Sequence, residues 1–157
     1  MRRLSAVLLA GAFLTLPAFS QSAFAQDAAP KPAAPPKTTY TGDAVIIAYS
    51  INPGKDADYE KVIASVKAGL QKSARPEAKQ QLAGWKVIKN ATPQPDGSSV
   101  YVHIISPIVP DADYSLTNIV YESATDDEKR AFYDLYKGAL QKPLFQIAGP
   151  LSSDFAK

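Results

Sequence analysis

The sequence feature that most restricts this fold is a fixed succession of two hydrophobic periodicities. Residues 44–51 (AVIIAYSI) are rich in β-branched and aromatic side chains and end at the turn Asn52-Pro53-Gly54, which predicts a strand. The next apolar residues recur every three or four positions, which predicts a helix that Asp56 or Asp58 can cap. This helical stripe consists of Tyr59, Val62, Ile63, Val66 and Leu70.

A hairpin is predicted in the middle of the chain. Pro76 suits the first turn of a second, short helix that stops at Gly84. Residues 85–89 (WKVIK) and 99–105 (SVYVHII) then form two strand patterns, which are separated by the turn-forming residues 93–97. Two strands joined by so short a connection are expected to pair antiparallel.

The last part of the chain contains a second long helix and a last strand. Residues 114–121 (YSLTNIVY) fit either a short helix or an extended segment. Thr125 and Glu128 have the spacing of a capping box, and an apolar stripe of helical period follows them. Residues 144–147 are the predicted last strand, which can continue towards Phe155.

The order strand, helix, hairpin, helix, strand predicts an α+β fold of the ferredoxin-like βαββαβ type. Such a domain has one four-stranded antiparallel sheet, with the first and third strands as central neighbours. Both long helices lie on the same face of the sheet, so the other face needs a cover. Residues 41–157 are assigned to this domain.

Two segments precede the predicted domain. Residues 1–25 have a basic start, an apolar run and the small-residue pattern Ala23-Phe24-Ala25, which together predict a cleaved signal peptide of the Sec type. Residues 26–40 are rich in alanine and proline and are predicted to be a disordered tether. We therefore expect a periplasmic or secreted bacterial protein that is not inserted in the membrane after signal cleavage.

Composition narrows the chemistry that this chain can perform. It contains no cysteine, which excludes disulfides, thiolate catalysis and cysteine-ligated metals. A single histidine without cysteines predicts no metal site and no bound cofactor. The first 25 residues hold two of the 17 basic residues and none of the 15 acidic ones, so the remaining charges balance. Nucleic acid is therefore not an expected partner.

Side-chain alternation along the strands divides the predicted sheet into two faces. The face with small aliphatic residues, such as Ala48 and Val102, is expected to lie under the helices. The opposite face carries Tyr49, Tyr101 and His103, and we expect a second subunit to cover it or a cavity to lie against it.

The predicted ligand-binding residues are Tyr49, Trp85, Tyr101, His103 and Tyr114. Tyrosine joins an apolar ring to a polar hydroxyl, which suits pockets for partly polar ligands. His103 is the only side chain whose ordinary pKa lies near neutrality, so it is the candidate base if the protein is an enzyme. For each of these residues a purely structural role is the alternative. The tyrosines expected on helix faces, with their hydroxyls in solvent, are Tyr59, Tyr133 and Tyr136.

The chain from Thr41 to Phe155 resembles the dimeric α/β-barrel superfamily, in which two ferredoxin-like units close their sheets into a shared barrel. Its segments GWKV (84–87), DG (96–97), YVHII (101–105) and DYS (113–115) resemble those of a group of small exported bacterial proteins of unknown function. Superfamily members include cofactor-independent monooxygenases, haem-degrading enzymes, haem peroxidases and ligand-binding regulatory modules. The resemblance therefore implies a fold and a homodimer without selecting a function.

These observations predict an exported homodimer that acts as a non-catalytic binding module for a small apolar or aromatic molecule, or for another protein. The alternative is an enzyme similar to the cofactor-independent monooxygenases, in which His103 removes a proton from a phenolic or enolic substrate. A third interpretation is a purely structural dimer that the proline-rich tether presents.

Overall fold

The computed structural model describes residues 35–155, so the predicted signal peptide and residues 26–34 of the predicted tether lie outside the described residues. In chain order the elements are β1 (Ala44–Ile51), α1 (Asp56–Lys72), α2 (Ala78–Gly84), β2 (Trp85–Lys89), β3 (Ser99–Ile105), α3 (Leu116–Tyr121), α4 (Asp126–Ala139) and β4 (Leu140–Gly149). None of the helices in this part of the chain is long and apolar enough to cross a membrane.

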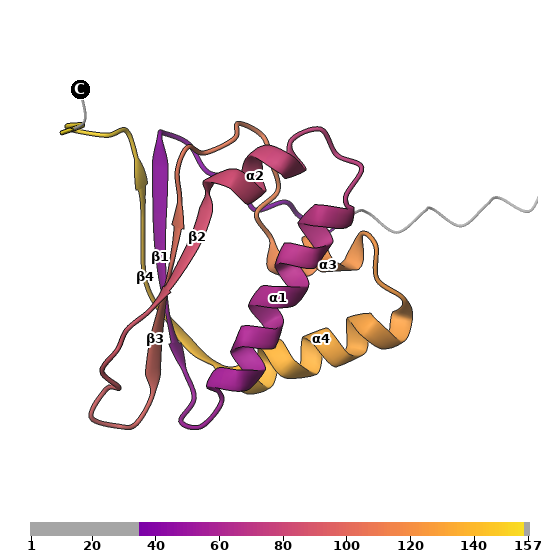
Figure 1. Ribbon diagram of the computed structural model, residues 1–157, viewed down its shortest axis with the longest axis vertical. Coiled ribbons are helices and arrows are strands. Elements are labelled where there is room, and N and C mark those ends of the chain that lie inside the picture. Colours follow the sequence, from indigo (N-terminus) through magenta and orange to yellow (C-terminus); the bar gives the residue numbers. More distant parts are fainter. Residues whose placement is uncertain (1–34, 156–157) are drawn as a thin grey trace, which may run out of the picture. The chain divides into compact units, whose positions relative to one another are not determined.

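The four strands form one antiparallel sheet in the order β2-β3-β1-β4. The predicted α+β class and four-stranded antiparallel sheet are thus confirmed, and β1 and β3 are the central pair as expected. Figure 1 shows the sheet edge-on at the left and the helices together at the right. One face of the sheet therefore carries the helical layer, while the other face is uncovered in the described chain.

The predicted assignment of the two sheet faces was wrong. Tyr101 and His103 are buried beneath the helices, whereas the aliphatic Ile46 and Val102 lie on the uncovered face. Side-chain size was a misleading guide, because the polar ends of the large residues find hydrogen-bond partners on α1. The face without such polar ends is the one left open.

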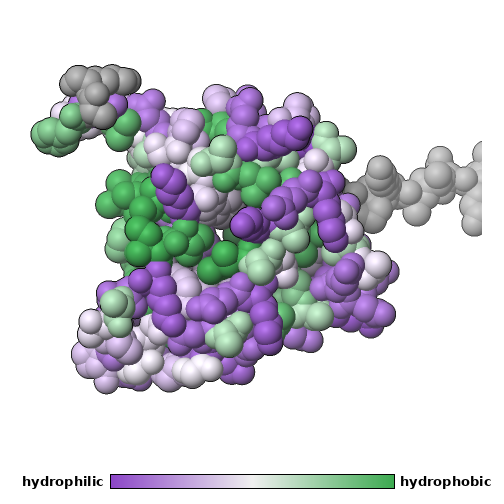
Figure 2. All heavy atoms as spheres, viewed as in Figure 1, coloured by the Kyte–Doolittle hydropathy of each residue, from purple (hydrophilic) through white to green (hydrophobic). Residues whose placement is uncertain are grey.

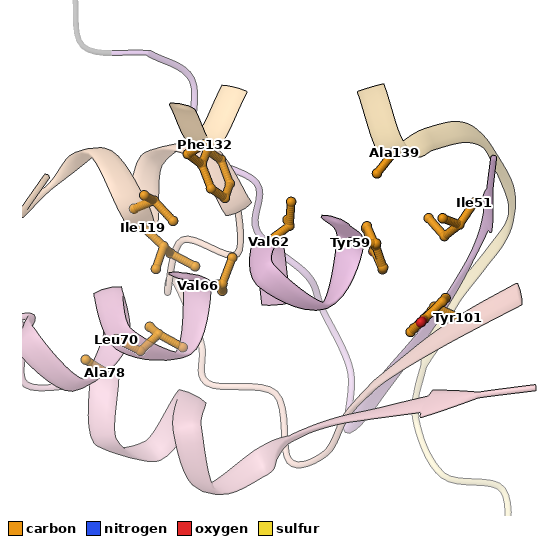
Figure 3. Close-up of a cluster of buried hydrophobic side chains, with 11 residues drawn as sticks. Ile51, Tyr59, Val62, Val66, Leu70, Ala78, Tyr101, Ile119, Phe132 and Ala139 are labelled. Carbon is orange, nitrogen blue, oxygen red and sulfur yellow. The ribbon is translucent and has the colours of Figure 1, made fainter. Parts of the chain in front are cut away.

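The main core lies between the helices and the end of the sheet that contains Ile51 of β1 and Tyr101 of β3. Helix α1 contributes a buried stripe in which Tyr59 and Val62 are fully inaccessible to solvent. Figure 3 shows this stripe with Ile119 and Phe132 of α3 and α4 on one side and the strand residues Ile51 and Tyr101 on the other. The predicted helical period therefore describes the buried face of α1 correctly.

The helix N-caps predicted from the sequence are confirmed for α4 but not for α1. Thr125 accepts from the backbone N–H of Glu128 and the Glu128 carboxylate accepts from the Thr125 N–H, so the predicted capping box is present on α4. Asp56 and Asp58 do not cap α1; they lie in its first turn, where a carboxylate still complements the helix dipole. In the ambiguous segment 114–121, residues Leu116–Tyr121 form the short helix α3, and Ser115 is its N-cap.

Residues at the end of the predicted tether contact the folded domain. The Thr38 N–H donates to the Asp113 carboxylate at 3.0 Å, and the Tyr114 N–H donates to the Thr38 carbonyl at 2.8 Å. The Tyr40 ring packs against Tyr114 at a centroid distance of 5.5 Å. The contacts of the domain thus begin several residues before the predicted boundary at residue 41.

Two helical glycines are expected to respond to alanine in opposite directions. A Cβ on Gly69 of α1 would lie 2.9 Å from the Ile119 carbonyl oxygen, whereas a Cβ on Gly138 of α4 would meet no atom within 4 Å. Gly138→Ala should stabilise by up to about 1 kcal/mol, since alanine loses less backbone entropy in a helix. Gly69→Ala should destabilise by roughly 1 kcal/mol or more, because overpacking exceeds that gain. Urea unfolding measures both, and equal shifts would contradict the close α1–α3 contact.

Candidate functional site

A pocket of about 360 Å³ lies between helices α1 and α2 and strands β2 and β3. Its walls are mostly aliphatic, its aromatic and imidazole residues come from three different elements, and one lysine from α1 completes it. In the view of Figure 2, which faces this side of the molecule, the pocket lies between β2 and α1. The lining residues are Tyr59, Val62, Ile63, Val66, Lys67, Leu70, Leu82, Trp85, Val87, His103 and Leu116.

Three of the lining residues form a continuous hydrogen-bonded chain. Trp85 Nε1 lies 3.1 Å from His103 Nδ1, and His103 Nε2 lies 2.9 Å from the Tyr59 hydroxyl. Since an indole N–H can only donate, Nδ1 must be the acceptor nitrogen of His103. In the neutral imidazole the proton then lies on Nε2, which donates to the Tyr59 oxygen. The tautomer follows from the donor inventory of these partners.

Burial keeps His103 neutral. The side chain is 3% exposed, and the loss of solvation lowers the pKa of His103 to about 4. Protonation would also place a second N–H opposite the Trp85 N–H, which removes that hydrogen bond. At neutral pH both ring nitrogens are therefore engaged, one as acceptor and one as donor.

The five predicted ligand-binding residues gather around one position, but only Trp85 and His103 line the pocket. Tyr49 contacts His103 edge-on at 5.3 Å, and burial raises the pKa of Tyr49 to about 12. Tyr114 packs against Trp85 at 5.7 Å, and its hydroxyl accepts from the Val109 N–H. The other three predicted residues therefore lie outside the pocket lining, and each packs against a lining residue: Tyr49 against His103, Tyr101 against Tyr59 and Tyr114 against Trp85.

Tyr101 connects the sheet to the start of α1. Its hydroxyl lies 3.1 Å from a carboxylate oxygen of both Asp56 and Glu60, and Lys89 pairs with Asp56 at 2.7 Å. Burial, with the two carboxylate contacts, raises the pKa of the Tyr101 hydroxyl above its ordinary value. This arrangement keeps Tyr101 a hydrogen-bond donor and gives it an anchoring role outside the pocket.

The most important pocket residue that sequence reasoning missed is Tyr59. It was expected on a helix face with its hydroxyl in solvent, yet it is fully buried and bonded to His103. Its place as the first residue of the apolar stripe of α1 was the available signal. The expectation for Tyr133 was correct, since this side chain is exposed, whereas Tyr136 is partly buried.

A second feature is the uncovered face of the sheet. Ile88 on β2, Ile46 on β1, and Phe145 and Ile147 on β4 all point to this side and are 37–66% exposed. The half-buried Val102 and Ile104 of β3 lie between them. Figure 2 shows hydrophobic residues gathered over the sheet side of the molecule, at the left. Lys86, whose ladder partner is Ile104, adds a charge to this mostly apolar surface. Exposed apolar surface is common at interaction sites.

Comparisons with protein-family models, with curated proteins and with solved structures give no match to this chain. Among residues 35–155, no group of three or more histidine, aspartate or glutamate side chains is placed to hold a metal ion. The interpretation of the site therefore depends on the geometry of the pocket and of the uncovered sheet face.

The low pKa of His103 predicts a specific loss of stability in acid. The unfolded chain takes up a proton near pH 6.5, but the folded chain only near pH 4, so stability falls as pH decreases between these values. The shift corresponds to about 3 kcal/mol. Because this is the only histidine, His103→Gln should flatten the pH dependence over that range.

Urea unfolding of both proteins at pH 7, 5.5 and 4 measures this effect. The carboxylates titrate alike in the two proteins, so the difference between them isolates His103. His103→Gln should be the less stable protein at pH 7, and the gap should narrow towards pH 4. Parallel pH profiles would show that His103 is not held neutral by burial.

Proposed function

We propose that this protein is a non-catalytic, homodimeric binding module of the cell envelope that holds a small apolar or aromatic molecule in the pocket between α1 and the sheet. The observation that carries this proposal is the pocket itself. Its volume of about 360 Å³ lies within the range of small-molecule sites, and most of its lining residues are hydrophobic. It is also more than twice the volume of a cavity of roughly 150 Å³ that admits benzene.

The hydrogen bonds of His103 favour binding over catalysis. A general base needs a free lone pair within reach of the substrate proton. The Nδ1 lone pair of His103 accepts from Trp85, and Nε2 carries the proton that Tyr59 accepts. The monooxygenase-like alternative would require one of these bonds to break before proton transfer, whereas binding of an apolar molecule leaves both intact.

The proposed dimer uses the uncovered face of the sheet. Strand order β2-β3-β1-β4 with the helices on one side is compatible with a ferredoxin-like unit, and this superfamily resemblance implies paired sheets. A second copy of this chain is the proposed partner, because the apolar side chains at the middle of this face can pair with their own copies about a two-fold axis while Lys86 of β2 lies towards its edge. Permanent homodimer interfaces are also the more hydrophobic class.

Location in the periplasm or outside the cell is proposed from the first 25 residues, whose pattern is that of a signal peptide. In such an oxidising compartment many domains are stabilised by disulfides, but this chain has no cysteine to form them. The stability of the folded domain must therefore come from its hydrophobic core. The two buried clusters on the helical side supply that core.

Pocket binding is tested with the hydrocarbon 2-phenylhex-1-ene and the folded domain. We expect one molecule to bind per chain, with a change in the emission of Trp85, the only tryptophan. Ile63→Trp, which fills the pocket from α1, should weaken binding at least tenfold. Ala64→Trp adds the same side chain at the neighbouring exposed position and should leave the affinity unchanged. Calorimetry that detects no binding of this hydrocarbon or of a ketone of the same shape, or equal affinities in all three proteins, would refute the binding function.

Dimerisation is tested by sedimentation equilibrium. The domain should sediment as a dimer, and Ile147→Lys should raise its dissociation constant at least a hundredfold, because the new charge would be buried without a partner. Tyr133→Lys replaces an exposed residue of α4, on the helical side, and should leave the dimer intact. A monomeric parent domain at tens of micromolar, or equal effects of the two variants, would exclude pairing through this face.

A further inference from the structure

The series of hydrogen bonds from Trp85 through His103 to Tyr59 ends in the Tyr59 hydroxyl, which can still donate its own hydrogen. Trp85 donates to His103 Nδ1, and His103 Nε2 donates to the Tyr59 oxygen, so the hydroxyl hydrogen of Tyr59 is not used within this chain. No described residue accepts a hydrogen bond from it, since its one hydrogen-bond contact is the acceptor side of the bond from His103. Tyr59 is fully buried, and burial raises the pKa of its hydroxyl, which therefore stays protonated.

A buried hydroxyl with an unused hydrogen is an unusual feature of a protein interior, where polar groups normally find partners. Tyr59 and His103, which share the hydrogen bond, both line the pocket. Tyr59 has no solvent-accessible surface in this structure, so an occupant that accepts from its hydroxyl must move the side chains that cover it at this end of the pocket. The aliphatic walls around it, such as Val62, Val66 and Leu82, offer no polar group to the rest of that occupant.

We propose that the pocket selects apolar molecules that carry one neutral oxygen acceptor, such as a ketone or ester carbonyl, and that the Tyr59 hydroxyl donates to this oxygen. This inference rests on the proposed binding function and adds the chemical class of the ligand. Tyr59 acts here as a specificity-determining residue.

We call the end of the pocket next to Tyr59 and His103 its inner end. It holds no positive charge, so we expect the oxygen acceptor of the ligand to be neutral. His103 is uncharged at neutral pH, and a carboxylate beside it would lose its hydration for a single hydrogen bond. The one cationic lining residue, Lys67, is exposed and lies eight residues further along α1, which is about 12 Å along the helix axis. An anion that uses Lys67 would therefore sit at a different end of the pocket from the Tyr59 hydroxyl.

The test compares two probes of the same shape, valerophenone and 2-phenylhex-1-ene, which differ only in a C=O or a C=CH2 group. In the parent domain the ketone should bind roughly three- to tenfold more tightly, as expected for one net hydrogen bond. Tyr59→Phe should reduce this ratio to one or below. Tyr136→Phe, a partly buried tyrosine of α4 outside the pocket lining, should keep the parent ratio. The ratio within each variant cancels any general loss of pocket shape.

A measurement on the parent domain alone covers the case in which Tyr59→Phe does not fold. The carbonyl stretch of bound, ¹³C-labelled valerophenone should lie at lower frequency than in cyclohexane, because a hydrogen bond weakens the C=O bond. An unshifted stretch, or equal affinity for the two probes, would overturn the role of Tyr59 and leave the binding function standing. Failure of both probes to bind would overturn both proposals.

A third probe separates a neutral acceptor from an anion. The carboxylate 5-phenylpentanoate should bind more weakly than valerophenone, both in the parent domain and in Lys67→Gln. Tighter binding of the carboxylate that is lost in Lys67→Gln would show that the pocket recognises an anion at Lys67 instead, and would refute the proposal.

Discussion

The hydrogen bonds of the buried His103 join parts of the chain that are distant in sequence. Its ring lies on the central strand β3, accepts from Trp85 on β2 and donates to Tyr59 on α1. Only a neutral imidazole can accept with one ring nitrogen and donate with the other at this position. An aliphatic or aromatic hydrocarbon here would leave the buried hydroxyl and indole N–H without their partner. The contact that anchors α1 on the sheet is thus also the contact that gives the pocket its polar end.

Local sequence signals predicted much of the fold because they depend on residues close together in the chain. Period two in residues 44–51, period 3.6 after Asp56 and the Thr125–Glu128 capping box each correspond to an element in the structure. Alternation divides a strand into two faces but does not say which face the helices cover. That choice depends on long-range partners: the Tyr101 hydroxyl reaches Asp56 and Glu60, which precede it by more than 40 positions.

The candidate site was predictable only in part, for a related reason. Of the predicted binding residues, Trp85 on the edge strand β2 and His103 on the central strand β3 line the pocket. Its volume, however, arises from how α1 and α2 sit over β2, and most of its wall comes from aliphatic residues that a core would equally contain. Tyr59 was missed because a tyrosine at the start of an amphipathic helix resembles one whose hydroxyl reaches solvent.

Strand β3 explains why the two proposed interactions do not compete for the same residues. Its side chains alternate, so Tyr101 and His103 face the helices while Val102 and Ile104 face the uncovered side. On the inner side, the Tyr101 hydroxyl and the His103 ring form hydrogen bonds with residues of α1. On the outer side, the β-branched Val102 and Ile104 contribute apolar surface. A second copy on that surface would cover β2 and β3 on the side opposite the pocket, because Val87 and His103 line the pocket while Ile88 and Val102 of the same strands belong to the uncovered face. Ligand and partner would then meet the same strands on opposite faces of a single sheet.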